Sequence, residues 1–251
     1  MIPINQWSPE TGGFFLIDKP KGWTSFDVVN KMRFRLRILS KDKKIKVGHA
    51  GTLDPLATGL LIVCVGKMTK QIDSFMGLPK TYTGEITFGA STPSYDAETE
   101  PDSIMPYDHI TPEILERARL SFLGNIEQMP PMYSAIKVAG KPLYESARQG
   151  KTIEVPARPV FIESFTLDVG RWTLDVGKTN NPASIVQCPT ALNFEVNCSK
   201  GTYIRSLVHD FGKACGTVAF MSALRRTAIG SYHINDALTV EKWETLFSYE
   251  L

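Results

Sequence analysis

Residues 48–55 place a carboxylate and an imidazole on one loop that is rich in small residues. The segment reads GHAGTLDP, so that Asp54 precedes Pro55 and His49 lies five positions upstream. Proline favours an extended backbone at the residue before it, and the glycines allow another chain to approach closely. A carboxylate presented in this way suits nucleophilic or acid–base chemistry. The alternative, which an isolated Asp-Pro favours, is a turn without a chemical role.

A second carboxylate is harder to find. Hydrolysis of a glycosidic bond usually requires two, and Asp96 is a candidate partner for Asp54 that sequence alone does not bring close to it. The cysteines at 64, 188, 198 and 215 form no Cys-x-x-Cys pair, and no histidine lies at zinc-ligand spacing from them. The sequence therefore predicts reduced, packed thiols and no metal centre.

Aromatic and basic side chains suggest contact with nucleic acid. Tyr82 and Tyr203 are able to stack on bases, although a lone tyrosine is more often a core or rim residue. Four basic residues are candidates for binding phosphate: Lys200, Arg205, Arg225 and Arg226. The alternative is that they are surface residues that only contribute to solubility.

The distribution of charge is more informative than its sum. The formal net charge is only +2, from 28 basic and 26 acidic residues. Residues 31–46 contain eight Lys or Arg and one acid, whereas residues 85–116 contain eight acids and no Lys or Arg. A positive face of this kind suits a phosphate backbone, and a solvated helix end is the alternative.

Hydrophobic spacing predicts the elements that must position these residues. Alternating or continuous apolar runs predict strands at 14–17, 60–65, 82–88, 160–169 and 192–198. Helical spacing and capping signals predict helices that begin at Thr24, near Met68, at Thr111 with its end at Leu123, at Thr202 and near Val240. Residues 31–38 alternate between basic and apolar and fit a strand as well as a helix. Strands interspersed with single helices predict an α+β or mixed α/β fold.

Two segments lack this periodicity. Residues 125–159 carry several prolines and glycines and resemble an inserted loop or hairpin, and residues 170–191 form an excursion between two strands. Apolar residues make up 43% of the chain, but the longest apolar run, 60–65, is far shorter than the ~20 residues of a membrane span. No signal peptide is evident at 1–14, so a cytoplasmic location is expected.

Six longer segments combine these features. They read LIDKPKGWTSFDVV at 16–29, GHAGTLDPLATGLLIVCVGKMTK at 48–70, KTYTGEITFGASTPSYDAET at 80–99, MPPMYSAIKVAGKPLYESARQG at 129–150, CSKGTYIRSLVHDFG at 198–212 and ALRRTAIGSY at 223–232. In this order they resemble the TruB-type tRNA pseudouridine synthases, which convert the T-loop uridine of tRNA, conventionally U55, to pseudouridine. These enzymes break the C1′–N1 bond, turn the uracil and rejoin it through C5.

The resemblance implies roles for three charged residues. Asp54 matches the catalytic aspartate, which acts on the ribose at C1′ or by a route through an eliminated glycal. Arg205 matches the arginine that pairs with this aspartate. A cation within about 4–6 Å favours the charged form of a carboxylate, which would keep Asp54 ionised. Asp96 matches an acid that orients this arginine.

The remaining implied roles concern the target base. Tyr82 matches the aromatic that stacks on it, and Tyr203 a second active-site tyrosine that transfers a proton after C5 bonding. Leu224 matches an apolar residue that lines the uracil pocket. His49 matches the histidine that fills the place of the extruded nucleotide, whose flipping costs a few kcal/mol.

The resemblance also implies an architecture. We expect an α+β pseudouridine synthase fold: a central mixed, mostly antiparallel sheet flanked by helices, on a single catalytic domain spanning 1–251. Most members of the family carry a C-terminal PUA domain after the last helix, and this sequence is expected to depart from them by lacking it, since it ends at Leu251. Residues 125–159 match an inserted RNA-binding thumb, whose phosphate contacts would come from Lys137, Lys141, Arg148, Lys151 and Arg158. The expected partner is the T-arm of tRNA, with no cofactor, no metal, no membrane and no obligate protein partner, and the expected state is a monomer.

Two other function classes remain open at this point. The same scaffold without turnover would be an RNA-binding or tRNA-folding protein, which the joint presence of Asp54, Tyr82 and Arg205 disfavours. A nucleoside hydrolase would release free uracil, and it lacks an evident second carboxylate.

Overall fold

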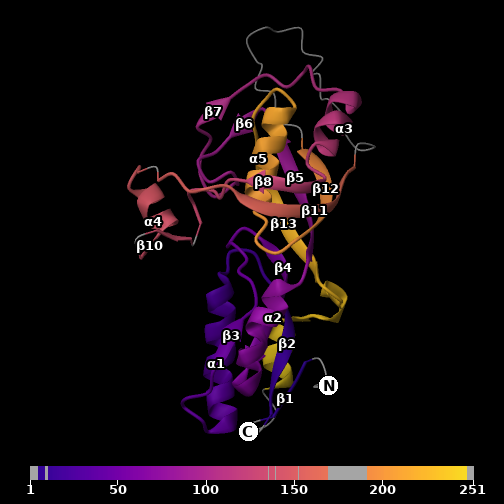
Figure 1. Cartoon of the computed structure of the whole chain (residues 1–251). Helices are drawn as coiled ribbons and strands as arrows, with labels where there is room; N and C mark the ends of the chain where they lie inside the picture. Colours follow the sequence, from indigo (N-terminus) through magenta and orange to yellow (C-terminus); the bar gives the residue numbers. More distant parts are fainter. Residues whose placement is uncertain are drawn as a thin grey trace, which may run out of the picture. The chain divides into compact units, whose positions relative to one another are not determined.

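A computed structural model describes residues 5–8, 11–134, 136–138, 140–151, 153–168 and 191–247, which divide into two compact units (Figure 1). One unit consists of 1–82 and 224–251 and contains Asp54; the other consists of 83–223 and contains Arg205. We call them the Asp54 unit and the Arg205 unit. The chain passes between them within two strands, β5 (Lys80–Phe88) and β13 (Ala219–Ile229). The expectation of one catalytic domain over 1–251 stays a prediction.

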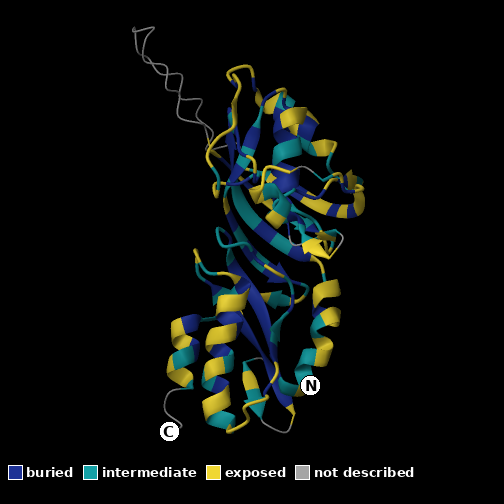
Figure 2. Ribbon diagram, turned by 90° about the vertical axis from the view of Figure 1, so that its left-hand side faces the viewer, coloured by how far each residue is buried: buried dark blue, intermediate teal, exposed yellow. Residues whose placement is uncertain are grey.

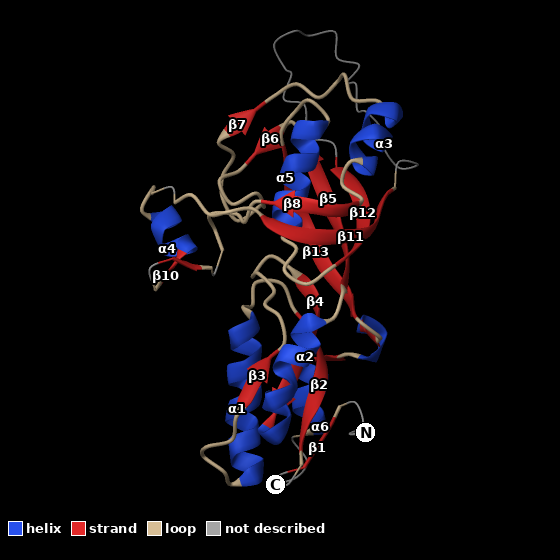
Figure 3. Cartoon of the chain, in the orientation of Figure 1, coloured by secondary structure: helices blue, strands red, loops and turns tan. Residues whose placement is uncertain are grey.

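The Asp54 unit combines a sheet with helices (Figure 3). Its further strands are β1 (Gln6–Ser8), β2 (Gly12–Lys19), β3 (Val47–His49), β4 (Thr58–Val65), β14 (Tyr232–His233) and β15 (Leu238–Thr239). Its helices are α1 (Ser25–Ser40), α2 (Ile72–Gly77) and α6 (Val240–Leu246), with the 3₁₀ turns η1 (Gly66–Gln71) and η3 (Ile234–Asp236). Strand β4 pairs antiparallel with β2 and β3, and it pairs in parallel with β13.

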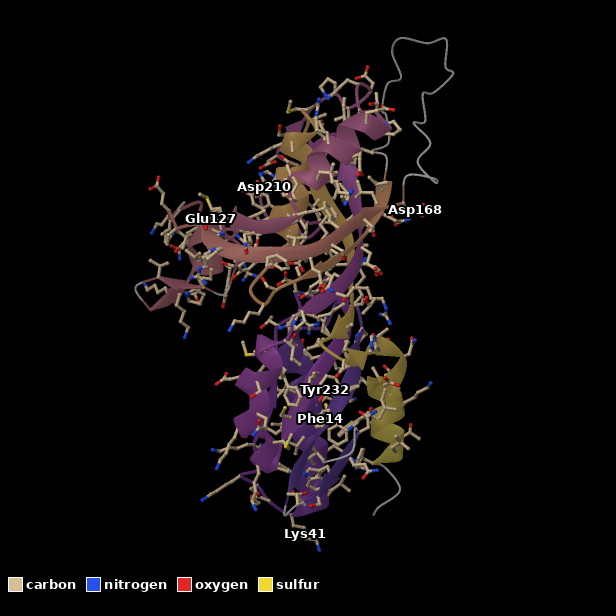
Figure 4. The ribbon with its side chains drawn as sticks, turned by 45° about the vertical axis from the view of Figure 1, so that its right-hand side comes forward. Phe14, Lys41, Glu127, Asp168, Asp210 and Tyr232 are labelled. Carbon is tan, nitrogen blue, oxygen red and sulfur yellow. The ribbon has the colours of Figure 1, made fainter. Side chains whose placement is uncertain are left out.

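Strands β2 and β4 are buried on both faces, as their dark blue ribbons show in Figure 2. Phe15 and Ile17 belong to a core cluster with residues of α1 and α6, whereas Phe14 belongs to a second cluster with Phe75 of α2. Figure 4 shows Phe14 next to Tyr232, with the two ring centroids 5.6 Å apart. Burial on both faces explains why the predicted strand at 60–65 is continuously apolar.

Helix α1 resolves the ambiguous segment at 31–38. The predicted capping box is confirmed, since Thr24 and Asp27 hydrogen-bond each other's backbone N–H. Met32 and Leu36, four residues apart, are buried, whereas Phe34 between them is 70% exposed. The segment is therefore helical, and its strand-like alternation came from the placement of basic residues rather than from two different faces.

The Arg205 unit holds the remaining elements. Its further strands are β6 (Ala90–Ser91), β7 (Ser103–Ile104), β8 (Gly124–Gln128), β9 (Lys137–Val138), β10 (Lys141–Pro142), β11 (Arg158–Leu167) and β12 (Ala191–Cys198), and its helices are α3 (Pro112–Leu120), α4 (Leu143–Arg148) and α5 (Ile204–Ala214). The sheet order is β13-β5-β12-β11-β8. The predicted alternation on β12 is confirmed, and Phe211 of α5 packs on Phe165 of β11 with centroids 5.4 Å apart.

The structure corrects two predicted boundaries. Helix α3 ends at Leu120 rather than Leu123, because a succession of tight turns follows it and Gly124, with φ at +80°, begins β8. The N-cap of α5 is Tyr203 rather than Thr202, because the Thr202 hydroxyl donates to the carbonyl of Ser199 instead of accepting from the helix.

The insertion predicted at 125–159 begins and ends in the sheet, and its role as an RNA-binding thumb stays a prediction. Its two ends pair with each other, from Arg158 opposite Gln128 to Ile162 opposite Gly124, so they belong to the sheet. Between them lie the β9–β10 hairpin and α4. The excursion predicted at 170–191 lies outside the described residues except for Ala191, which begins β12.

Two general expectations can be compared with the described part of the chain. None of its helices is long and apolar enough to cross a membrane. Cys64, Cys198 and Cys215 are buried, and burial raises the pKa of the Cys64 and Cys215 thiols to about 12. Such thiols pack rather than react.

Candidate active site

Asp54 lies on the loop between β3 and β4, and the backbone around it is anchored on both sides. The Ser25 hydroxyl accepts from Leu53 N–H at 2.8 Å and donates to the Leu53 carbonyl at 3.1 Å. On the other side, Gly22 N–H donates to the Pro55 carbonyl at 2.8 Å. The side chain of Asp54 is half-buried. Its position is thus set by the first turn of α1 and by the turn that precedes this helix.

A buried arginine supports the same loop. Arg226 is 1% exposed and donates from Nε to the Leu60 carbonyl at 2.7 Å, with longer contacts to the carbonyls of Gly51 and Thr52. Gly59, at φ +104°, allows β4 to approach it, because a Cβ there would lie 2.3 Å from the Arg226 carbonyl oxygen. The phosphate-binding prediction for Arg226 is wrong, because its charge is enclosed by backbone carbonyls.

His49 ends β3, opposite Val63 of β4, and it is half-buried. Burial, followed by the nearby charge of Arg226, lowers its pKa below the ordinary value of 6.5. Nδ1 is enclosed and has no hydrogen-bond partner. The imidazole is therefore neutral at pH 7, which suits a ring that has to stack between bases. Its proposed role as a plug for the extruded nucleotide stays a prediction.

Tyr82 and Leu224 lie in the strands where the chain changes units. Tyr82 on β5 is 8% exposed, and Leu224 on β13 is 9% exposed. The Leu224 carbonyl accepts from the Thr58 hydroxyl at 3.5 Å, which links it to the start of β4. Stacking by Tyr82 and lining of the uracil pocket by Leu224 stay predictions.

Arg205 and Asp96 form a buried ion pair in the Arg205 unit. Nε of Arg205 lies 3.5 Å from Oδ2 of Asp96, and the two side chains are 7% and 0% exposed. The Asp96 carboxylate also accepts from the Ser94 hydroxyl at 2.6 Å, and the other guanidinium nitrogens donate to the carbonyls of Ser94 and Tyr133. The geometry suits an acid that orients an arginine, the role that the resemblance implies.

Tyr203 is held by its backbone. The buried Gln128 at the end of β8 accepts from Tyr203 N–H at 2.7 Å and donates to the Tyr203 carbonyl at 3.0 Å. One turn into α5, the Ser206 hydroxyl donates to the Met129 carbonyl at 2.9 Å. The start of α5 is therefore fixed to the root of the predicted thumb. A proton-transfer role for the Tyr203 phenol stays a prediction.

The predicted phosphate contacts differ in setting. The thumb residues Lys137, Lys141, Arg148, Lys151 and Arg158 are exposed, as backbone contacts to RNA would require. Lys200 is also exposed, whereas Arg225 forms an ion pair with Asp18 at 2.7 Å. Their contacts with RNA stay predictions.

The site residues thus divide between the units. The Asp54 unit holds Asp54, His49, Tyr82 and Leu224, and the Arg205 unit holds Arg205, Asp96, Tyr203 and the thumb. Pairing of Asp54 with Arg205 stays a prediction.

Sequence reasoning missed the supporting residues. These are Ser25, Gln128 and Ser206, which form hydrogen bonds to backbone groups up to 77 positions away in the sequence. No local sequence pattern indicates such bonds. The signal that was available is their burial pattern: Gln128 is a polar residue at a position where an amphipathic strand is expected to be apolar.

Comparisons with known proteins give a consistent result. The profile of the TruB family pseudouridylate synthase N-terminal domain matches residues 37–204, and that of the tRNA pseudouridylate synthase B C-terminal domain matches 205–250. A relative from Flavobacterium johnsoniae, named tRNA pseudouridine synthase B, is 45% identical over 93% of this chain and 95% of its own length. One of the same name from Parabacteroides distasonis is 43% identical over 92% and 91%.

A solved structure extends the comparison to the fold. The archaeal box H/ACA sRNP Nop10-Cbf5 complex contains a chain with a TM-score of 0.61 and 21% identity, and the match covers 96% of this chain and 55% of that one. The predicted α+β fold, a mixed sheet flanked by helices, is confirmed by this likeness and by the sheet itself. From its profile matches and its relatives, the chain belongs to the TruB family of pseudouridylate synthases.

Proposed function

We propose that the protein is a tRNA pseudouridine synthase that isomerises the T-loop uridine U55. The relatives that share 43–45% of its residues over almost their whole length carry the name tRNA pseudouridine synthase B. The structural observation that carries the proposal is the anchored loop of Asp54, because a nucleophile has to be held in one geometry while a flexible RNA is brought to it.

The reaction is an isomerisation, so nothing is gained or lost from the nucleotide as a whole. Asp54 acts on the ribose, the C1′–N1 bond breaks, and the uracil turns and bonds to C1′ through C5. The proton leaves C5, and N1 is protonated. In this proposal Arg205 stabilises the charge of the Asp54 carboxylate, Tyr82 stacks on the flipped base and His49 fills the gap that the base leaves.

The exposed basic residues position the RNA. The thumb contributes five, and the end of α1 with the loop after it contributes Arg37, Lys41, Lys43, Lys44 and Lys46, all exposed. Affinity for tRNA should therefore fall steeply with salt. Replacing Lys137 and Lys141 with Gln should reduce the slope of log affinity against log salt by about one per residue, without a change in sequence preference. A slope that is flat in the unchanged protein would contradict the basic surface.

Tritium release tests the proposed reaction. A T-arm transcript labelled with tritium at uridine C5 should lose label to water in the presence of the protein, and digestion should yield pseudouridine at the target position. Binding without release would support the RNA-binding alternative, and release of free uracil would support hydrolysis. A cytoplasmic location, where tRNA is found, is part of the proposal.

A further inference from the structure

Tyr95 adopts a backbone conformation that large side chains rarely adopt. Its φ angle is +62°, in the left-handed region, where a non-glycine residue is strained. Such a conformation persists only when its surroundings determine it. The next residue is Asp96, the carboxylate that pairs with Arg205. The strained position is therefore adjacent to the buried ion pair.

The backbone of this turn is fixed on both sides. Tyr95 N–H donates to the Thr92 carbonyl at 3.1 Å, and the Tyr95 carbonyl accepts from Met221 N–H at 3.0 Å. The Thr92 hydroxyl donates to the Asp96 carbonyl at 2.7 Å. These bonds close the turn, but none of them reaches α5, the helix that carries Arg205.

Arg205 already joins this turn to α5 through Asp96 and the Ser94 carbonyl, and the Tyr95 ring adds a second connection one turn further along the helix. The ring stacks on the His209 imidazole, with ring centroids 3.7 Å apart and planes inclined by 12°. His209 lies four residues after Arg205, one turn further along the same face of α5. Two adjacent loop residues, Tyr95 and Asp96, thus contact two helix residues one turn apart, and this pair of contacts fixes the register between loop and helix.

Both rings are neutral at pH 7. Burial, followed by the charge of Lys213, lowers the pKa of His209 to about 4, and the charge of Asp102 and a hydrogen bond with the Ala219 backbone oppose this with smaller effects. Burial also raises the pKa of Tyr95, with smaller contributions from the charges of Asp210 and Asp102. Asp210, labelled in Figure 4, follows His209 on α5. The stack is therefore a contact between uncharged rings.

We propose that Tyr95 and His209 are positioning residues, whose stack holds Asp96 in register with Arg205. The effect of this stack on catalysis rests on the proposed function, whereas its effect on the position of Asp96 does not. If the stack were purely structural, its loss would lower the stability of the protein and nothing else. If it positions Asp96, its loss also lets the ion pair between Asp96 and Arg205 open more often in the folded protein.

Hydrogen exchange at Arg205 Nε–H, followed by NMR, tests the positioning directly. We expect about tenfold faster exchange in Tyr95→Ala and in His209→Ala, since opening of the ion pair exposes the group. Tyr95→Phe keeps the stack and should exchange as the unchanged protein does. His233→Ala, an exposed histidine on β14, is the matched control.

Tyr95→Gly separates strain from stacking. Glycine adopts the left-handed conformation without strain, so this variant should unfold at a higher temperature than Tyr95→Ala but exchange equally fast at Arg205. Unchanged exchange in Tyr95→Gly or His209→Ala would overturn the proposal, even if the protein had no activity on tRNA.

Turnover gives the catalytic readout. In Tyr95→Ala and His209→Ala, kcat for a T-arm substrate should fall about tenfold while KM changes less than twofold, and Tyr95→Phe should restore kcat. The double variant should be no slower than either single variant, since both remove one contact. A raised KM with an unchanged kcat would overturn the proposal. Absence of tritium release by the unchanged protein would instead contradict the proposed function.

Discussion

Two buried arginines, one in each unit, support the candidate site in different ways. Arg226 donates to carbonyls of the Asp54 loop and of β4. Arg205 pairs with Asp96 and donates to the carbonyls of Ser94 and of Tyr133 at the thumb root. The first contacts one continuous stretch of chain, residues 51–60, whereas the second contacts two separate segments, one at 94–96 and one at Tyr133. A buried guanidinium can therefore support the backbone or belong to the site itself. Bonds to carbonyls alone favour the first role, and an ion pair with a buried carboxylate favours the second.

Replacement of Arg205 should have the largest effect in this comparison. Arg205→Met leaves the Asp96 carboxylate buried without its cation, which costs about 3–5 kcal/mol of folding free energy, and tritium release should fall by roughly two orders of magnitude or more. Chemical denaturation and a single-turnover assay measure the two effects. Arg117→Met, at an exposed arginine of α3, is the control.

A second substitution separates the two effects of Arg205→Met. Adding Asp96→Asn removes the unpaired charge, so the double variant should regain part of the stability and remain inactive. Recovery of turnover in the double variant would show that the guanidinium is not required for the reaction.

Replacement of Arg226 should lower the stability of the fold more than it lowers turnover. Arg226→Met removes the donors to Leu60, Gly51 and Thr52 and should cost about 3 kcal/mol, because each buried acceptor left unpaired costs about 1–3 kcal/mol. Turnover of the folded fraction should stay within about tenfold of the unchanged protein. Thermal unfolding and activity at low temperature measure this, with Arg117→Met again as control. A loss of turnover as large as that of Arg205→Met would remove the distinction between the arginines.

The contrast also shows what sequence reasoning reaches. Hydrophobic spacing predicted β4 and β12, and Thr24 with Asp27 predicted the start of α1, because these signals lie within a few residues. The residue types of the loop at 48–55 indicated Asp54, whereas the pairing of Asp54 with Arg205 was expected only from the family resemblance. The predicted end of α3 and the predicted N-cap of α5 were wrong. Short turns determine the first, and a threonine hydroxyl with two possible partners determines the second.

What sequence could not predict are bonds between distant segments. Arg226 contacts the carbonyl of Gly51 from 175 positions away, and it looked like a surface phosphate ligand next to Arg225. Tyr95 gives no local sign of its left-handed backbone, which bonds to Thr92 and Met221 fix, or of its stack on His209. Both features arise from tertiary packing, which a single sequence does not display.

The smallest predicted effect concerns pH. His209 has a folded pKa of about 4 against an ordinary value of 6.5, so the unfolded chain binds more protons between these values. Its contribution to stability is therefore fully present above pH 6.5 and is lost as the pH falls towards 4. Denaturation curves across this range should show a shallower decline for His209→Gln than for the unchanged protein. Equal declines would place the acid sensitivity elsewhere.

Asp54→Asn in the tritium-release assay tests the central claim most directly, with Asp73→Asn, at an exposed acid of α2, as control. The account predicts that turnover falls at least about a thousandfold, while tRNA affinity and unfolding temperature stay near those of the control. Tritium release at the control rate by Asp54→Asn would contradict it.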